Sequence, residues 1–451
     1  MVQAVPAVAA WAAGSAAAAA VVAVVNTILI NVALGALAKS LVKKPKTQAP
    51  PINVTIRNPV ENRRIVFGTT RVSGVFAYYA TSGENNKYLW YVVAYAGHQC
   101  AASKDHWLDT QRVANSIIGG GAAEGGAVTT GVFANKLWIY KHLGTSAQTV
   151  DAELNAAIPS VWDANHRLKG CTYSVIKMER DDEKYPQGAP ADCTALLDGA
   201  LLYDSRRDST NGGSGAHRRT DPSTWEFDTI GRNPILQARW FISGGSVHND
   251  STSRLVMYGL RDPDSRIPDS YFAAAANICD EVLSGANAPP SGSQARYRSD
   301  LEVSTGETRR EILEAILATC AGTLVNVHGQ HRIYAGAYDA PTHAFTEKDL
   351  YGELAIEDTL DHDRRRNQVA AVFRDAANEY IEQTTPFRTD SAYETQDGGE
   401  PIPTEIDLRG VTDQYQAQRL CEIDLRKSRM MRSVKLPGAL NLLKVALHET
   451  L

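Results

Sequence analysis

The apolar run from Ala7 to Ala38 constrains this chain most, because it contains no charged residue. As a helix it would be roughly 48 Å long at about 1.5 Å per residue, which exceeds the ~30 Å of a bilayer core. The first charged residue is Lys39, and the segment 43–51, KKPKTQAPP, then combines lysines with prolines. Such a segment ends a helix and keeps the chain solvated. We therefore predict an apolar helix and a Lys/Pro linker at residues 1–47, attached to a separate body.

Three interpretations of the run compete. A secretory signal peptide needs a basic start and an apolar core of about 7–15 residues, and the run is too long and follows no Lys or Arg. A membrane-spanning helix fits both its length and its lysine flank. A helix enclosed in a protein assembly fits as well, and we favour it because small and hydrogen-bonding residues recur at four-residue spacing. These residues are Ala19, Ala23, Thr27, Asn31 and Gly35. Such a face favours contact between helices, and a lone Asn in it often sets their number.

Composition narrows the function classes. The 451 residues are enough for roughly two to four domains, and the formal net charge of -5 argues against a dedicated nucleic-acid binder. Six cysteines lie far apart and form no CxxC pair, so the sequence indicates neither a zinc ribbon nor a thioredoxin-like site. We expect free, buried thiols, and one or two disulfides remain possible.

The body begins as a series of strands. Apolar, β-branched and aromatic residues dominate the segments 52–57, 64–68, 71–80, 87–96, 136–141, 171–180 and 194–203. Turn residues separate them, which predicts an antiparallel barrel or sandwich. The strand at 87–96 is so apolar that we expect both its faces to be buried. The glycine-rich stretch 117–131 lacks the Lys-Ser or Lys-Thr of a phosphate loop, so it is predicted to be a mobile surface loop.

The remaining chain mixes helices and strands. We predict a β-rich domain at 48–205 with an insertion around 106–168, and an exposed loop plus a helix at 206–300. A helix over 308–320 followed by a hairpin indicates a small α+β domain at 301–350. A β-rich domain with one helix over 413–429 follows at 351–451, and we expect the native chain to continue beyond it. The predicted fold class is α+β, mostly β, with several domains.

No stretch shows the pattern of an active site. The carboxylate clusters Asp181-Asp182-Glu183, Asp262/Asp264 and Asp361/Asp363 lie in turn-like segments beside Lys or Arg. His98 and His106 lie near Cys100 without a metal-binding helical spacing, and no GxSxG motif occurs. We predict no catalytic, cofactor-binding or metal-binding residues, and a structural or binding protein that is not an enzyme.

A series of short stretches resembles a known family. They are 58–68 (NPVENRRIVFG), 71–74 (RVSG), 87–89 (KYL), 96–98 (AGH), 142–145 (HLGT), 199–206 (GALLYDSR), 274–281 (AAANICDE), 336–338 (GAY), 397–400 (DGGE) and 417–419 (AQR). In order and spacing, over about residues 50–430, they resemble the central tail-tip or hub protein of siphovirus-type bacteriophages. This is the tip-attachment or host-specificity family typified in phage lambda.

The resemblance implies a virion protein with a tail-hub architecture of β-barrel-rich domains. It implies a homotrimer at the distal tip of the tail, assembled in the host cytoplasm, which closes the tail tube, organises host attachment and opens for DNA ejection. Its implied partners are the distal tail protein, the tape-measure protein and other tail-tip proteins, and later tail fibres, the receptor and the host membrane. Genomic DNA would pass through the lumen without specific binding. The face formed by Ala19, Ala23, Thr27, Asn31 and Gly35 would then lie on the trimer axis.

Two other functions remain open from the sequence. The N-terminal helices could insert into the host envelope and form a pore during ejection. A tail-associated hydrolase is the second alternative. The resemblance implies no cofactor and supplies no catalytic residue.

Overall fold

A computed structural model describes residues 61–120, 124–181, 183–185, 188–249, 254–284, 292–338, 346, 351–353, 355–357, 365–430, 433–435 and 437. All of them belong to one compact unit, Thr55–Leu451. The apolar run and the predicted axis face at Ala19, Ala23, Thr27, Asn31 and Gly35 lie outside the described residues. Within the described residues, no helix combines the length and apolar character needed to cross a membrane.

A five-stranded antiparallel sheet has the strand order β3-β4-β9-β8-β7. Its strands are β3 (Val75–Ser82), β4 (Tyr88–Ala96), β9 (Thr172–Glu179), β8 (Leu137–Leu143) and β7 (Gly125–Ala127). The strand predicted at 87–96 is β4, and both its faces are buried as expected. Trp90 and Val92 join one hydrophobic cluster, and Val93 and Tyr95 join another, because successive side chains of a strand point to opposite faces.

A second antiparallel sheet has the order β2-β10-β5-β6. It consists of β2 (Thr69–Ser73), β10 (Cys193–Ala200), β5 (Cys100–Leu108) and β6 (Gln111–Val113). The two sheets share one hydrophobic cluster, to which the first contributes Val93 and Ile139 and the second Ala195 and Leu197. The other face of the first sheet is covered around α3 (Ala152–Ala157), whose Leu154 is fully buried.

The glycine-rich stretch differs from its prediction as a mobile loop. Gly125 to Ala127 form β7 at the edge of the five-stranded sheet, and Gly119 N donates to Ala127 O at 2.7 Å. Glycine is required at 125 because φ is +78° there and a Cβ would lie 2.0 Å from Ile139 O. The glycines thus allow a close backbone approach inside a sheet.

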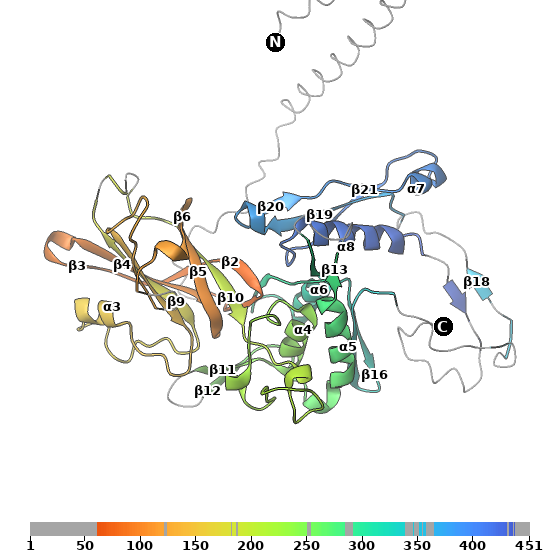
Figure 1. Cartoon of the computed structure of the whole chain (residues 1–451), viewed down its shortest axis with the longest axis horizontal. Helices are drawn as coiled ribbons and strands as arrows, with labels where there is room; N and C mark the ends of the chain where they lie inside the picture. The colour runs from red at the N-terminus through yellow and green to blue at the C-terminus, as the bar shows by residue number, and fades with distance from the viewer. Residues whose placement is uncertain are drawn as a thin grey trace, which may run out of the picture. The chain divides into compact units, whose positions relative to one another are not determined.

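The middle of the chain forms a helical layer. Helix α4 (Pro234–Ser243) packs against α5 (Asp269–Asp280) and α6 (Arg309–Ala318), as Figure 1 shows. All three helices contribute to a third hydrophobic cluster. The same cluster includes side chains of the antiparallel pair β1 (Arg64–Phe67) and β15 (Leu301–Ser304).

Three two-stranded antiparallel sheets belong to this part of the chain. They are β11 (Ser246–Asn249) with β12 (Arg254–Met257), β13 (Val282–Leu283) with β14 (Gln294–Ala295), and β16 (Thr323–Val327) with β17 (Gln330–Tyr334). The last pair is the hairpin predicted after the helix over 308–320.

The C-terminal part is built around β19 (Gln368–Asp375). It pairs antiparallel with β20 (Ile381–Thr384) and β21 (Arg388–Thr389), and parallel with β22 (Pro403–Asp407). Helix α8 (Gln414–Lys427) packs against β19, and α7 (Ser391–Gln396) precedes β22. A separate pair joins β18 (Ala355–Glu357) to β23 (Ser433–Lys435).

This architecture confirms the coarse prediction of a mostly antiparallel β protein with few helices. Closed barrels or sandwiches and the N-terminal helix stay predictions. The domain boundaries also stay predictions, although one hydrophobic cluster includes residues from Ile65 to Leu425 and so joins segments that were assigned to different domains.

A buried carboxylate ties four distant segments together. Asp300 is 1% exposed and accepts hydrogen bonds from Thr69 N at 2.8 Å, Arg232 Nε at 2.7 Å and Thr412 Oγ1 at 2.5 Å. Gly68 lies against it with φ of +64°, and a Cβ there would lie 2.1 Å from Ser299 O. The start of β2 can therefore approach this carboxylate only with glycine at 68.

Residues 204–224 include the start of the exposed loop predicted within 206–300, and buried acidic groups hold them in place. Asp208 is 1% exposed and accepts from Tyr203 Oη and Thr210 N, both at 2.8 Å. Arg206 pairs with Asp204, whose side chain is also 1% exposed. Many other residues of the segment are exposed, but these carboxylates fix its path.

Candidate functional site

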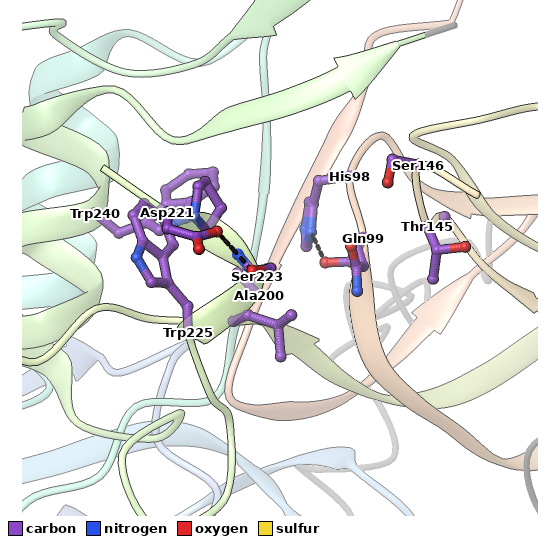
Figure 2. A pocket seen from close by; sticks show the side chains of 12 residues that line it. His98, Gln99, Thr145, Ser146, Ala200, Asp221, Ser223, Trp225 and Trp240 are labelled. Atoms are coloured by element: carbon purple, nitrogen blue, oxygen red, sulfur yellow. Dashed lines mark hydrogen bonds between the residues drawn. The ribbon is translucent and has the colours of Figure 1, made fainter. Parts of the chain in front are cut away.

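A hollow of about 380 Å³ lies where the two β-sheets meet α4. Residues after β4 and β8 line one side, the end of β10 lines the floor, and a turn before α4 lines the other side together with α4 itself. The lining residues are His98, Gln99, Gly144, Thr145, Ser146, Ala200, Leu201, Asp221, Pro222, Ser223, Trp225 and Trp240. Figure 2 shows the two tryptophans on one side and Gln99, Thr145 and Ser146 on the other.

The tryptophan side is rigid. Trp225 Nε1 donates to Arg218 O at 3.0 Å, which fixes the indole of this half-buried residue. Trp240 is 5% exposed and meets the Phe67 ring edge to face at 5.3 Å between centroids. Gly245 allows this position, because a Cβ there would lie 1.9 Å from the Trp240 ring.

The opposite side is polar and is positioned by a glycine turn. Gly144 has φ of +79°, and its N–H donates to Gln148 Oε1 at 2.8 Å. Gln148 is buried and in turn donates to the carbonyls of Arg167 and Leu168, both at 2.9 Å. This anchor presents Thr145 and Ser146 at the rim of the hollow.

Three polar groups of this side have no hydrogen-bond partner among the described residues. They are the side-chain amide of Gln99 and the hydroxyls of Thr145 and Ser146. Each of these groups can therefore form a hydrogen bond with a bound molecule.

Among the described residues that line the hollow, Asp221 carries the carboxylate. Its Oδ1 accepts from Ser223 N at 3.0 Å and from Ser223 Oγ at 2.6 Å, which starts the 3₁₀ turn η4 (Pro222–Thr224). These bonds to Ser223 lower the pKa of Asp221, so the group is ionised at neutral pH. Its Oδ2 has no partner within the described part of the chain, and the residue is exposed.

His98 has a structural role at the back of the hollow. Val66 N donates to its Nε2 at 2.9 Å, and its Nδ1 lies 2.7 Å from Gln99 O. These partners require the neutral tautomer with the proton on Nδ1. Burial lowers the pKa of His98 to about 4, so the ring stays neutral at physiological pH. With both nitrogens bound to backbone, it has no free site for a proton transfer.

The other residues near His98 that the sequence drew attention to are buried as well. His106 Nε2 lies 3.1 Å from Ser174 Oγ, its Nδ1 lies 3.1 Å from Lys104 O, and burial lowers its pKa to about 3. Burial raises the pKa of Cys100 to about 12, so its thiol is not ionised. Across the described residues, no three His, Cys, Asp or Glu side chains are placed to hold a metal ion. The six cysteines are free thiols, and five of them are buried.

The described aspartates of the carboxylate clusters each pair with a base or with a backbone N–H of their own turn. Asp181 accepts from Glu183 N at 3.1 Å within its own turn. Asp262 Oδ2 lies 2.7 Å from His331 Nε2, and Asp264 lies 3.5 Å from Arg219. Asp182, Asp361 and Asp363 lie outside the described residues. The observed carboxylates therefore neutralise neighbouring bases or close turns.

Sequence reasoning did not predict the hollow, although it singled out His98 and although the stretches 142–145 and 199–206 of the family resemblance include some of the lining residues. Gln99, Asp221 and Trp240 come from three segments, and none carries a motif of its own. The only local signal is the pair Trp225 and Trp240, two of seven tryptophans in the chain, and their approach depends on the path of the turn between them.

Comparison with known proteins gives limited matches. No protein-family model matches the chain. A stretch of 150 residues is 25% identical to the baseplate hub protein pb3 of Escherichia phage T5. The aligned stretch covers 33% of this chain and 16% of that protein. The match thus spans about one sixth of the length of this relative.

A solved structure, the virion of a native gene transfer agent (GTA) particle, contains a chain that is also similar. It aligns with 15% identity and a TM-score of 0.46, over 89% of this chain and 84% of that one. The sequence match to the T5 protein supports the broader prediction, a phage tail or hub protein, and does not single out the family typified in phage lambda.

Proposed function

We propose that the chain is a structural component of a phage tail hub. The observation that carries this proposal is the 25% identity over 150 residues with the baseplate hub protein of phage T5. The series of short stretches that resembles tail-tip hub proteins supports it from the sequence. In this proposal the protein is not an enzyme, and it belongs to the distal end of the virion tail.

The buried charges are consistent with a structural role. Asp300 holds four segments, and Asp397 is likewise buried, with a 3%-exposed side chain that accepts from Arg429 Nη1 at 3.0 Å and Asn367 Nδ2 at 2.9 Å. Carboxylates bound in this way cannot act as bases, and losing one partner leaves a buried charge unpaired. Such groups fix the positions of packed elements.

We further propose that three copies surround the tail axis, close the distal tail tube and open during DNA ejection. The face of Ala19, Ala23, Thr27, Asn31 and Gly35 would bring the three N-terminal helices together, with Asn31 selecting their number. The distal tail protein, the tape-measure protein and other tip proteins would surround this assembly. DNA would pass through its lumen without specific binding.

The test is the stoichiometry and location of the protein. Native mass spectrometry of the purified chain, together with a cryo-EM map of intact tails, should show three copies at the distal tip. A matched pair of variants examines the helix face: Asn31→Leu should shift the trimer toward other oligomers, whereas Asn26→Leu, off that face, should not. A protein that is monomeric and absent from tails would refute the proposal.

The apolar run favours a second candidate function, insertion into the host envelope. In this proposal the helices form a pore after the tip opens, and the two functions act at different stages. Dye release from liposomes by the opened particle should require residues 1–43. Release that persists after their deletion would exclude a helix-dependent pore without affecting the hub proposal.

A further inference from the structure

We propose that the hollow between Trp225 and Thr145 binds one ring of a neutral pyranose sugar. Its volume of about 380 Å³ lies near the lower end of the range of small-molecule sites. That size suits one sugar ring better than a nucleotide or a folded peptide. The proposal does not depend on the hub function, because it rests only on the groups that line this hollow.

Charge excludes the commonest anionic ligands. Among the described residues lining the hollow, Asp221 is the ionised group, and neither Lys nor Arg is present. His98 is held neutral by burial and by its two backbone partners. A phosphate or carboxylate would therefore meet a negative charge with no cation to offset it, so the ligand is neutral or positively charged.

The two sides of the hollow match the two kinds of surface on a sugar ring. A pyranose presents C–H groups on its faces and hydroxyls around its edge. The indole of Trp225 offers an apolar wall that its bond to Arg218 O holds in place, and aromatic walls pack well against such C–H faces. The hydroxyls would meet the Gln99 amide and the Thr145 and Ser146 hydroxyls, which have no partner in the described part of the chain.

A sugar also accounts for Asp221. Its Oδ1 is held by Ser223, while Oδ2 has no partner among the described residues and can accept from a ligand hydroxyl. The alternative ligand is a cation such as a quaternary ammonium, which tryptophans and a carboxylate also attract. A quaternary ammonium has no donor or acceptor for the three polar groups opposite and would leave them unsatisfied. The polar side therefore favours a neutral polyol.

The test uses the full chain and isothermal titration calorimetry. The probes are glucose, galactose, N-acetylglucosamine and the β1,4-linked trimer of N-acetylglucosamine, with tetramethylammonium and inorganic phosphate as comparison ligands. We expect saturable binding of at least one sugar and none of phosphate. Tighter binding of the trimer than of its monomer would identify the end of a glycan chain as the ligand, and equal binding would identify a free sugar.

Variants then locate the site. Gln99→Ala and Ser146→Ala each remove one proposed bond and no side-chain bond of the folded chain, so each should weaken sugar binding about fivefold to tenfold. Ser146→Trp should fill the hollow and abolish binding, and the exposed Gln111→Ala is the matched control with unchanged affinity. Three results would overturn the proposal: no saturable binding of any sugar, sugar binding that these variants leave unchanged, or binding of tetramethylammonium alone that Asp221→Asn abolishes.

Discussion

Acid should destabilise this protein through two buried histidines. The pKa of His98 is lowered by burial to about 4 and that of His106 to about 3, against about 6.5 for an exposed imidazole. Because the folded state disfavours protonation of both rings, the unfolded state binds more protons below pH 6.5. The stability that the neutral rings provide is complete above pH 6.5 and is lost as the pH falls toward the folded-state pKa values.

The magnitude follows from these values. At pH 5 an imidazole of pKa 6.5 is almost fully protonated in the unfolded chain, while both buried rings remain largely neutral. Each histidine then costs about 2 kcal/mol of unfolding free energy relative to pH 7.5, and the two together cost about 4 kcal/mol. With an m-value of about 3 kcal/mol/M, the urea midpoint should fall by roughly 1 M between these pH values.

Urea denaturation followed by tryptophan fluorescence at pH 7.5 and pH 5.0 measures this difference. In His98→Gln the side chain no longer titrates, so the acid-induced loss should shrink by about 2 kcal/mol. His166→Gln is the matched control, since the His166 side chain is 44% exposed and should leave the loss unchanged. Comparing variants at the same two pH values cancels the contribution of the carboxylates. An identical pH dependence in His98→Gln and the unmodified chain would refute the reasoning.

Three further substitutions, measured by equilibrium denaturation at pH 7.5, test the contacts that hold the fold together. Asp300→Ala leaves the half-buried Arg232, Thr69 N and Thr412 Oγ1 without their shared acceptor and should lower the free energy of unfolding by about 3–5 kcal/mol. Glu314→Ala, at an exposed pair, should lower it by less than about 1 kcal/mol. Similar losses in the two variants would contradict a special role for Asp300. Gly199→Ala should lower the free energy of unfolding by more than about 2 kcal/mol, because the added Cβ would lie 2.2 Å from Val66 O. A denaturation midpoint equal to that of the unmodified chain would show that β1 and β10 can move apart. Thr308→Ala removes the capping box of α6 and should lower the free energy of unfolding by about 1 kcal/mol. Thr308→Ser keeps the capping hydroxyl and should retain most of that stability.

Local sequence signals predicted elements where the signal and the structure depend on the same residues. Helix α6 is an example, because Thr308 and Glu311 form the capping box that starts it and Ile312, Leu313, Ile316 and Leu317 form its buried stripe. Strand β4 is another, since its apolar run is long enough to be buried by packing on both faces. In both cases periodicity and burial agree within one segment.

Elements defined by distant partners were not predictable in the same way. Strand β5 has the sequence CAASKDHWL, whose Ser, Lys, Asp and His interrupt any apolar alternation. It is a strand because β10 pairs with it along its length and because His106 finds a buried hydroxyl at Ser174. Strand β7 consists of two glycines and an alanine, and its place at the sheet edge depends on Ile139 and Tyr140 of β8.

The hollow was hidden from the sequence for a related reason. Gln99 and Asp221 are separated by more than a hundred positions, and each has an ordinary local role, one beside a strand end and the other in a turn. Their shared property is the hydrogen-bonding capacity that remains after folding. That property is known only when the hydrogen-bond partners of each polar atom in the folded chain are known, and a single sequence does not give them.

The buried carboxylates that hold the fold together differ from the polar groups of the hollow in how many hydrogen bonds they already accept. Asp300, Asp397 and Asp269 each accept from two or more side chains, and the arginines that bind them come from positions 30 to 68 residues away in sequence. Groups saturated in this way have little freedom to bind a ligand or exchange a proton, because a new partner must displace an existing one. In the hollow, by contrast, Asp221 and Gln99 keep unbound atoms on a rigid support. A protein that holds its elements with buried charges can keep such a site preorganised, because the groups that fix the fold are separate from the groups that remain available to a ligand.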